Sequence, residues 1–157
     1  MNNAFNNVTR MLNVNLLQTK PNSEENIFFE FNPDMQWLKS TPYKFNGVGV
    51  FRGKAECCNS TVIIKGQIEI PTEFVCSLCG ERFNENLFIE VDEVVVEDND
   101  DFEHFKIQQN KIDLNIILNE LVVLNIPSQV FCKPDCLGVC QICGKNLNEG
   151  ECGCKHD

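Results

Sequence analysis

Six cysteines lie in the last quarter of this 157-residue chain, and two more form a separate C-x-x-C pair upstream. A glycine follows each of the two C-x-x-C pairs, at Gly80 and Gly144, where it lets the backbone turn back so that amide groups face the sulfurs. Thiolates spaced in this way can converge on a metal ion without a large core, and a tetrahedral cage of sulfurs suits Zn²⁺. The sequence therefore predicts bound zinc, as one or two ions.

The spacing favours two groups of four ligands. The first joins the downstream C-x-x-C pair to the last two cysteines, because the eight residues between them carry Asn and Gly turn residues that return the chain: Cys140, Cys143, Cys152 and Cys154. The second joins the upstream pair to the two remaining tail cysteines, which would clamp the tail onto the β-structure: Cys76, Cys79, Cys132 and Cys136. Other groupings of the tail cysteines, a reduced tail without metal, and free thiols at the upstream pair stay open as alternatives.

Other thiol chemistry has weaker support. A thioredoxin-like C-x-x-C pair opens a helix in a βαβ pattern, which this sequence does not show, although a thiol redox sensor stays an alternative. The remaining cysteines, Cys57 and Cys58, are adjacent, and neighbouring residues of a strand point to opposite faces. We expect one of them to be buried, the other exposed, and neither to be a ligand.

The charge of the chain is strongly acidic and unevenly placed. Its formal net charge of −10 excludes nucleic-acid binding through the overall electrostatic field. Residues 39–65 hold five basic residues against one acidic residue, whereas residues 83–105 hold nine acidic residues and no Lys or Arg. We therefore expect one basic region and one acidic face.

Length and apolar patterning place the chain among soluble proteins of one domain with a small appendage. No apolar run approaches the roughly 20 residues that span a bilayer, so we expect no membrane association. The first residues lack both a charged start and an apolar stretch, which together would mark a secretion signal, so we expect a cytoplasmic protein.

Periodicity predicts the fold. Residues 43–57 and 86–96 and the alternating residues 61–70 indicate strands, and we expect Pro71 to make the end of its strand an edge or a bend. From residue 113 to 125 the apolar spacing changes to that of a helix, with Asp113 as its N-cap. The sequence thus predicts an α+β fold: a mostly antiparallel, partly barrel-like β-sheet, one main helix, and a C-terminal zinc knuckle.

We expect two parts, an α+β core domain of residues 1–127 and a cysteine-rich zinc-binding segment of residues 128–157 that packs on it. Residues 132–157 carry few large apolar side chains, so burial alone cannot hold them together. Metal binding would supply the missing folding energy, which is about 10–16 kcal/mol for a structural zinc site in isolated peptides.

Signs of catalysis are missing from the sequence. The chain has two histidines and contains neither a nucleophile elbow nor a P-loop, and all-cysteine zinc sites are usually closed to substrate. We therefore expect a protein that is not an enzyme and has no small-molecule substrate.

Three stretches together carry a resemblance to a known family. They are the strand–C-x-x-C–strand element of residues 74–83, the strand and helix of residues 105–127, and the cysteine-rich residues 132–148. In these stretches the chain resembles the YceD-like family, the large-subunit ribosomal RNA accumulation proteins of bacteria and plastids. The resemblance implies a non-catalytic factor that supports accumulation of large-subunit (23S-type) ribosomal RNA and ribosome assembly. Some members lack the C-terminal cysteines, so it also implies that metal stabilises the protein.

The charge pattern adds a hypothesis about partners. The acidic face around residues 90–103 would receive a basic ribosomal protein or processing factor. The basic stretch would contact ribosomal RNA phosphates through Lys44, Arg52 and Lys54. The aromatic residues interleaved with these cations would stack on unpaired bases: Tyr43, Phe45 and Phe51. The alternative is a zinc-ribbon adaptor between proteins, without a role in RNA.

Overall fold

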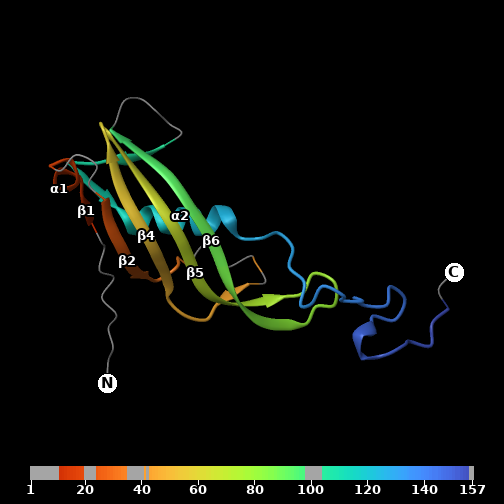
Figure 1. Cartoon of the computed structure of the whole chain (residues 1–157). Coiled ribbons are helices and arrows are strands. Elements are labelled where there is room, and N and C mark those ends of the chain that lie inside the picture. Colours follow the sequence, from red (N-terminus) through yellow and green to blue (C-terminus); the bar gives the residue numbers. More distant parts are fainter. Residues whose placement is uncertain (1–10, 20–23, 35–40, 42, 98–103, 156–157) are drawn as a thin grey trace, which may run out of the picture.

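The computed structural model of the chain is built around one large sheet (Figure 1). It describes residues 11–19, 24–34, 41, 43–97 and 104–155. The elements in chain order are β1 (Met11–Asn13), α1 (Val14–Gln18), β2 (Glu24–Phe31), β3 (Lys44–Phe45), β4 (Gly49–Cys58), β5 (Thr61–Val75), β6 (Arg82–Glu97), β7 (Phe105–Ile107), β8 (Lys111–Asp113), α2 (Leu114–Asn125) and the 3-10 helix η2 (Leu147–Glu149).

The main sheet is open. Its strands run in the order β2-β4-β5-β6-β7, with β3 paired to β5 beyond the end of β4, and every pair is antiparallel except β6 with β7. Within the described residues the edge strands β2 and β7 do not pair with each other, so the sheet is not closed into a barrel. The predicted α+β class with one main helix is confirmed, whereas the partly barrel-like closure is not.

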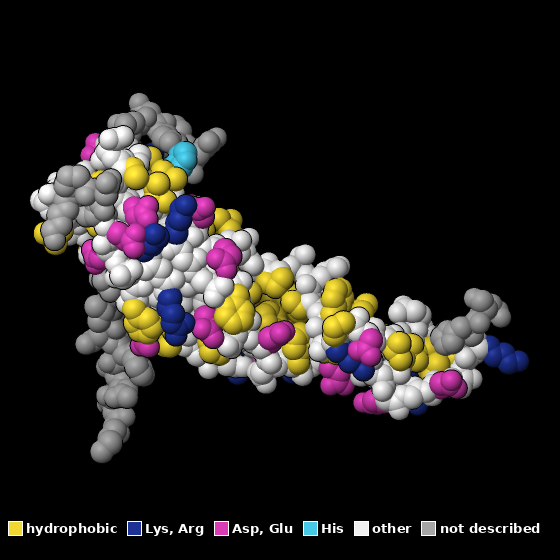
Figure 2. Space-filling model, in the orientation of Figure 1, with side chains coloured by type: hydrophobic (Ala, Val, Ile, Leu, Met, Phe, Trp, Pro, Cys, Tyr) yellow, Lys and Arg dark blue, Asp and Glu magenta, His cyan; other side chains and the backbone are white. Residues whose placement is uncertain are grey.

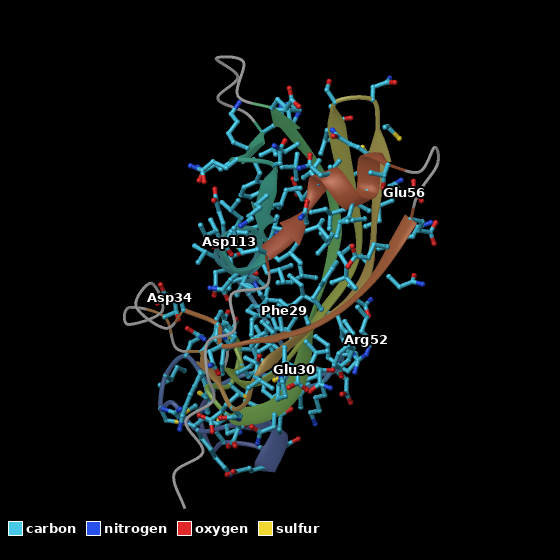
Figure 3. All side chains as sticks on the ribbon, turned by 90° about the vertical axis from the view of Figure 1, so that its left-hand side faces the viewer. Phe29, Glu30, Asp34, Arg52, Glu56 and Asp113 are labelled. Atoms are coloured by element: carbon cyan, nitrogen blue, oxygen red, sulfur yellow. The ribbon has the colours of Figure 1, made fainter. Side chains whose placement is uncertain are left out.

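Strict alternation along the strands separates two faces of the sheet. One face is buried under α2 and supplies most of the core, including Phe51, Ile64 and Ile68, each 0% exposed. The other side chains of β2, β4, β5 and β6 point away from α2, and we call this surface the outer face. Figure 3 shows Arg52 and Glu56 on that side of the sheet, opposite Asp113.

The aromatic residues expected to stack on RNA bases lie in the core, and this prediction is wrong. Tyr43 and Phe45 are each 9% exposed and Phe51 is 0% exposed. The cause is the period of two, since Phe45 and Phe51 alternate with the cations Lys44 and Arg52 and therefore face the other way. A strand cannot present both sets to one ligand.

Strand β5 continues through Pro71 to Val75, five residues beyond the stretch of alternating residues. Pro71 lies where the neighbour of β5 changes from β4, whose pairing ends at Glu69, to β3, whose pairing begins at Thr72. The Pro71 carbonyl accepts a hydrogen bond from the Asn46 N–H on this side, at 2.8 Å. Pro71 therefore lies outside both ladders on this side of β5, which is the edge position that the sequence predicts for it.

Helix α2 begins and ends where local signals predict. The Asp113 carboxylate accepts hydrogen bonds from the N–H groups of Asn115 and Ile116, and Pro127 follows the last helical residues. Its buried residues are Leu114, Ile117, Leu118, Leu121 and Val122.

Within the described parts of the chain, no helix has the length and apolarity that crossing a bilayer requires.

The long β5–β6 hairpin reaches beyond β4, and residues 76–81 form its tip. Figure 1 shows α2 behind the sheet, with the chain leaving its end to meet that tip and the cysteine-rich segment lying beyond it. The Ser77 N–H donates to the Val130 carbonyl at 2.8 Å, and the Val130 N–H donates to Ser77 Oγ at 3.1 Å. The helix thus brings residues 132–136 back to cysteines more than fifty positions earlier.

Candidate metal centre

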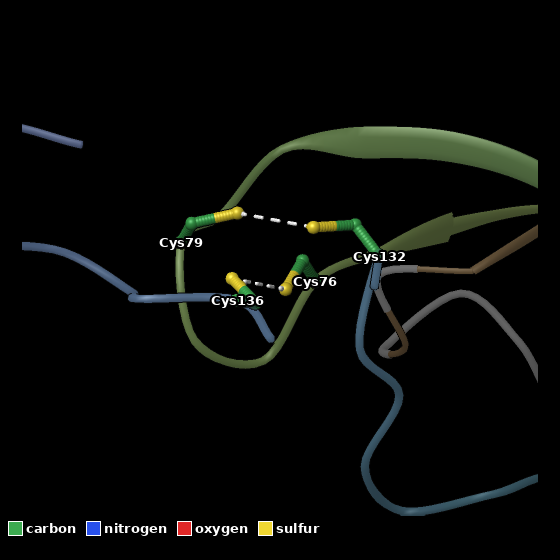
Figure 4. A group of neighbouring side chains, drawn as sticks. All are labelled: Cys76, Cys79, Cys132 and Cys136. Atoms are coloured by element: carbon green, nitrogen blue, oxygen red, sulfur yellow. Dashed lines mark hydrogen bonds between the residues drawn. The ribbon is translucent and has the colours of Figure 1, made fainter. Parts of the chain in front are cut away.

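The hairpin tip and the returning chain bring four cysteines together. Cys76 Sγ lies 3.7 Å from Cys136 Sγ, and Cys79 Sγ lies 3.7 Å from Cys132 Sγ (Figure 4). All four sulfurs lie within 4.8 Å of one another, and none of them is in a disulfide. We call this group the first tetrad.

These distances fit a tetrahedral thiolate site. Four sulfurs placed about 2.3 Å from a zinc ion at the corners of a tetrahedron lie about 3.8 Å from one another. A disulfide would instead bring two sulfurs to about 2.05 Å. The donor set, four thiols with no carboxylate or histidine, is the set that selects zinc over magnesium or calcium.

A second tetrad lies further along the chain. The sulfurs of Cys140, Cys143, Cys152 and Cys154 also lie within 4.8 Å of one another. Together the two tetrads contain all eight cysteines named as candidate ligands, and the two groups of four are those that the spacing favoured. Both groups are positioned to hold metal ions.

The two C-x-x-C-G turns that start these tetrads have the same backbone hydrogen bonds. At the hairpin tip the Cys76 N–H donates to the Glu81 carbonyl and the Gly80 N–H donates to the Cys76 carbonyl, at 2.8 and 2.9 Å. In the second turn Cys140 makes the equivalent bonds with Lys145 and Gly144, both at 2.8 Å. The glycines have φ of 75° and 74°, a left-handed conformation that glycine adopts without a Cβ clash.

These turns aim N–H groups at sulfur. The Cys143 and Ile142 N–H groups lower the pKa of Cys140 to about 6. Burial raises the pKa of Cys76, but surrounding N–H groups, that of Cys132 first, outweigh it and lower this pKa to about 6. Burial and the neighbouring thiols raise the pKa of Cys132 itself to about 12. Some thiols of each group therefore ionise readily while their neighbours resist a further negative charge, a conflict that a bound divalent cation removes.

Asn148 connects the two tetrads, and sequence patterns mark it only as a turn residue. Its Nδ2 donates to Cys136 Sγ at 3.4 Å, and its Oδ1 accepts the Leu137 N–H at 3.0 Å. The same residue belongs to η2, in the interval between Cys143 and Cys152. A ligand of the first tetrad is thus oriented by the loop that closes the second.

Replacing Asn148 by alanine is expected to weaken metal binding at the first tetrad by about 10–100-fold, the usual effect of removing a hydrogen-bond partner of a ligand. Competition against a chromophoric chelator measures this affinity. Asn125→Ala is the matched control, because Asn125 donates only to the Leu121 carbonyl on α2, among the contacts described for its side chain. Equal affinities for the two variants would show that Asn148 does not support Cys136.

The two cysteines expected outside the ligand sets do lie outside the tetrads. Cys58 is exposed, as expected, whereas Cys57 packs against the core but is half-buried and not buried. Cys57 lies close to the end of β4, two residues from the Asn59 turn, where the sheet no longer covers it completely.

Of the cations predicted to contact RNA, two are neighbours on β4 and the third lies on another strand. Arg52 and Lys54 lie on the outer face, whereas Lys44 lies on β3, opposite Glu73 of β5. Arg52 pairs with Glu69 at 3.0 Å, and Lys54 pairs with Glu24 and Glu56 at 2.9 and 2.7 Å. Of the predicted acidic face, residues 98–103 lie outside the described residues, and Glu90 and Asp92 are exposed on β6.

Comparison with known proteins gives the family. A curated relative from Zea mays, named "Large ribosomal RNA subunit accumulation protein YCED homolog 1, chloroplastic", is 37% identical over 57 residues, which is 36% of this chain and 20% of the relative. The match therefore spans about a fifth of that protein's length. No solved structure matches the chain. The model of the family described as "Large ribosomal RNA subunit accumulation protein YceD" matches residues 64–157, a stretch that contains both tetrads. The chain therefore belongs to the YceD family.

Proposed function

We propose that this protein is a non-catalytic, zinc-binding factor that supports accumulation of large-subunit ribosomal RNA and assembly of the ribosome. The observation that carries the proposal is the family match over residues 64–157, because it covers the β5–β6 hairpin from residue 64 on, α2 and all eight tetrad cysteines. The family's description names the accumulation of the large ribosomal RNA subunit.

The tetrads support a structural role for metal within this function. Each consists of four cysteines, and a zinc ion with four protein ligands has no open position for a substrate. Zinc would supply a cross-link that holds the cysteine-rich segment on the hairpin tip, while this chain's residues orient the sulfurs. We propose one ion for each tetrad.

Partners of two kinds fit the proposal. A basic ribosomal protein or processing factor suits the net charge of −10, whereas direct contact of ribosomal RNA with Lys44, Arg52 and Lys54 stays a prediction. The division of the chain after residue 127 and a cytoplasmic location also stay predictions.

Depleting the protein in the organism that encodes it tests the proposed function. Large-subunit ribosomal RNA is expected to fall relative to small-subunit RNA, and a plasmid copy of the chain should restore the ratio. An unchanged ratio in fully depleted cells would overturn the proposal.

Gradient sedimentation of cell extract then separates the two function hypotheses. Sedimentation of the protein with precursors of the large subunit supports the proposal. Sedimentation with one non-ribosomal partner, away from ribosomal precursors, supports the alternative of a zinc-bound adaptor without a role in RNA.

A further inference from the structure

The outer face of the sheet exposes two phenylalanines. Phe28 on β2 is 55% exposed and Phe88 on β6 is 56% exposed, although both strands bury their alternate residues. Figure 2 views the molecule from the side opposite α2 and shows hydrophobic side chains scattered among acidic and basic ones. Aromatic side chains are enriched at protein–protein interfaces, so the two exposed rings are candidate contact points for a partner.

Each exposed phenylalanine has a glutamate beside it on the same face. Glu30 follows Phe28 by two residues on β2, and Glu90 follows Phe88 by two residues on β6. Side chains two positions apart on a strand are neighbours on one surface. The outer face therefore carries the same Phe-x-Glu pair on two strands, β2 and β6, with two other strands between them.

The strand register arranges the two pairs head to tail. In one row across the sheet Phe28 lies opposite Arg52, then Gln67, then Glu90. In the next row, the residues from β2 to β6 are Glu30, Val50, Glu69 and Phe88. We call these eight residues the Phe–Glu patch. The two Phe-x-Glu pairs form its opposite sides, roughly 14 Å apart at the usual strand spacing.

The charge of the patch is negative at its sides. Its single cation, Arg52, pairs with Glu69 inside the patch at 3.0 Å. Glu30 and Glu90 are exposed and form no ion pair with the described residues, and Glu90 accepts a hydrogen bond from Gln67. An open hollow of about 550 Å³ adjoins Glu90, lined also by Arg52, Lys65, Gln67 and Asp92. Phosphates are repelled by such a surface, whereas cationic side chains are attracted.

One arginine of the chain already contacts a phenylalanine ring of the patch. The Arg52 guanidinium carbon lies 5.4 Å from the centre of the Phe28 ring, within the range of a cation–π contact. An aromatic ring beside a carboxylate that forms no ion pair with the described residues offers an arginine both a ring face and a charge partner. The two sides of the patch offer this combination twice.

We propose that the Phe–Glu patch docks an extended, arginine-rich protein segment, with one arginine on each Phe-x-Glu pair. The span of roughly 14 Å matches two side chains four residues apart in an extended chain. This inference deepens the proposed function, on which it rests for its biological setting, because it names the chemistry of the partner.

A peptide titration tests the docking. The probe is an otherwise uncharged twelve-residue peptide with arginine at its fourth and eighth positions, added to the zinc-loaded, ¹⁵N-labelled full chain. Amide shifts on β2 and β6 report where it binds, and their concentration dependence gives the affinity. Replacing both Glu30 and Glu90 by glutamine is expected to weaken binding about tenfold, and replacing both Phe28 and Phe88 by serine by a similar factor.

Matched controls exclude effects of net charge and of apolar surface in general. Glu85→Gln with Glu97→Gln removes the same charge from exposed residues of β6 outside the patch, and Phe131→Ser removes a phenylalanine that is 48% exposed elsewhere. Both controls should bind as the unchanged chain does. Unchanged binding by the patch variants would overturn the proposal, as would shifts confined to other surfaces.

Two further probes decide between partners. A peptide with the same two arginines adjacent should bind more weakly than the spaced one, and equal binding would overturn the two-point geometry. The second probe is a twelve-nucleotide oligouridine. If it binds the unchanged chain more tightly than the peptide does, and if Phe28→Ser with Phe88→Ser abolishes this binding, the docking proposal is overturned, because the patch would then stack RNA bases.

These outcomes are distinguishable from failure of the proposed function. Peptide binding at the patch with an unchanged ribosomal RNA ratio after depletion would leave the docking standing and remove its ribosomal setting. A lower ratio of large-subunit to small-subunit RNA after depletion, with no peptide binding at the patch, would support the proposed function and overturn the docking.

Discussion

Replacing Cys79 by serine is expected to remove one of the two proposed zinc ions and to release residues 128–137 from the tip of the β5–β6 hairpin. Cys79 Sγ faces Cys132 Sγ at 3.7 Å, so the change breaks the link between two parts of the chain that lie more than fifty residues apart. Serine does not replace a thiolate as a ligand for zinc, and three ligands hold the ion poorly. Most of the folding energy of such a site, about 10–16 kcal/mol in isolated peptides, is then lost locally.

Elemental analysis measures the first effect and limited proteolysis the second. The unchanged chain should carry two zinc ions and resist cleavage between Val130 and Leu137, whereas the variant should carry one ion and be cleaved there. Cys58→Ser is the matched control, because Cys58 is exposed and lies outside both tetrads. Purified unchanged protein without metal, or a Cys79→Ser variant that keeps two ions, would contradict the prediction.

The second tetrad gives a contrasting variant. Cys154→Ser is expected to remove the other ion while the first tetrad keeps its metal, because all four of its sulfurs come from residues 76–136. The hairpin tip should then stay protected from proteolysis, since the Ser77–Val130 hydrogen bonds and the first tetrad are intact. Loss of both ions in this variant would instead show that the bridge through Asn148 makes the two tetrads one cooperative unit.

Local signals in the sequence predict a good part of this structure. The cap at Asp113 and the stop at Pro127 mark α2 because both act within one turn of the helix. The two C-x-x-C-G turns likewise depend on six consecutive residues each, so a local pattern with a glycine in the left-handed position is enough to predict them. The cysteine spacing indicated the grouping of sulfurs that the structure has, because eight thiols in four close pairs allow few closed sets.

Features that depend on pairing between distant segments of the chain could not be predicted from the sequence. The parallel pairing of β7 with β6 and the position of β3 on β5 join segments whose order in the sheet no local pattern encodes. The role of Asn148 depends in the same way on the return of the chain to Cys136. The burial of Phe45 and Phe51, in contrast, can be predicted from the sequence, because each is next to a cation in a strand and therefore points to the opposite face. The error came from treating residues 43–54 as one basic surface.

Replacing Gly53 by alanine is expected to destabilise the sheet by at least about 3 kcal/mol, the upper part of the range for overpacked cores. Gly53 of β4 lies directly opposite Gly66 of β5, and both lie on the core side of the sheet. A Cβ added at Gly53 would lie 2.2 Å from the Lys65 carbonyl oxygen and 2.6 Å from the Phe51 ring. The first contact is with backbone, so no side-chain rotation relieves it and the two strands must separate.

The same geometry makes Gly66→Ala equally damaging. Its added Cβ would lie 2.3 Å from the Arg52 carbonyl oxygen and 2.8 Å from the Phe51 ring. The fully buried Phe51 ring thus covers a pair of facing glycines and fills the space that their missing side chains leave. An aromatic ring over a glycine pair lets the backbones of β4 and β5 approach where larger residues would hold them apart.

Urea unfolding of the zinc-loaded protein, followed by far-ultraviolet circular dichroism, measures the loss. Gly47→Ala is the matched control, because the nearest atom to its added Cβ would be Pro71 Cγ at 3.4 Å, an ordinary contact. Domains of this size are stable by about 5–15 kcal/mol, so either glycine variant should shift the midpoint far below that of the control. A Gly53→Ala variant as stable as Gly47→Ala would mean that β4 and β5 do not pair at these two glycines. The row that aligns Phe28 and Arg52 with Gln67 and Glu90 would then fall with it, since the β4–β5 ladder joins the two halves of that row.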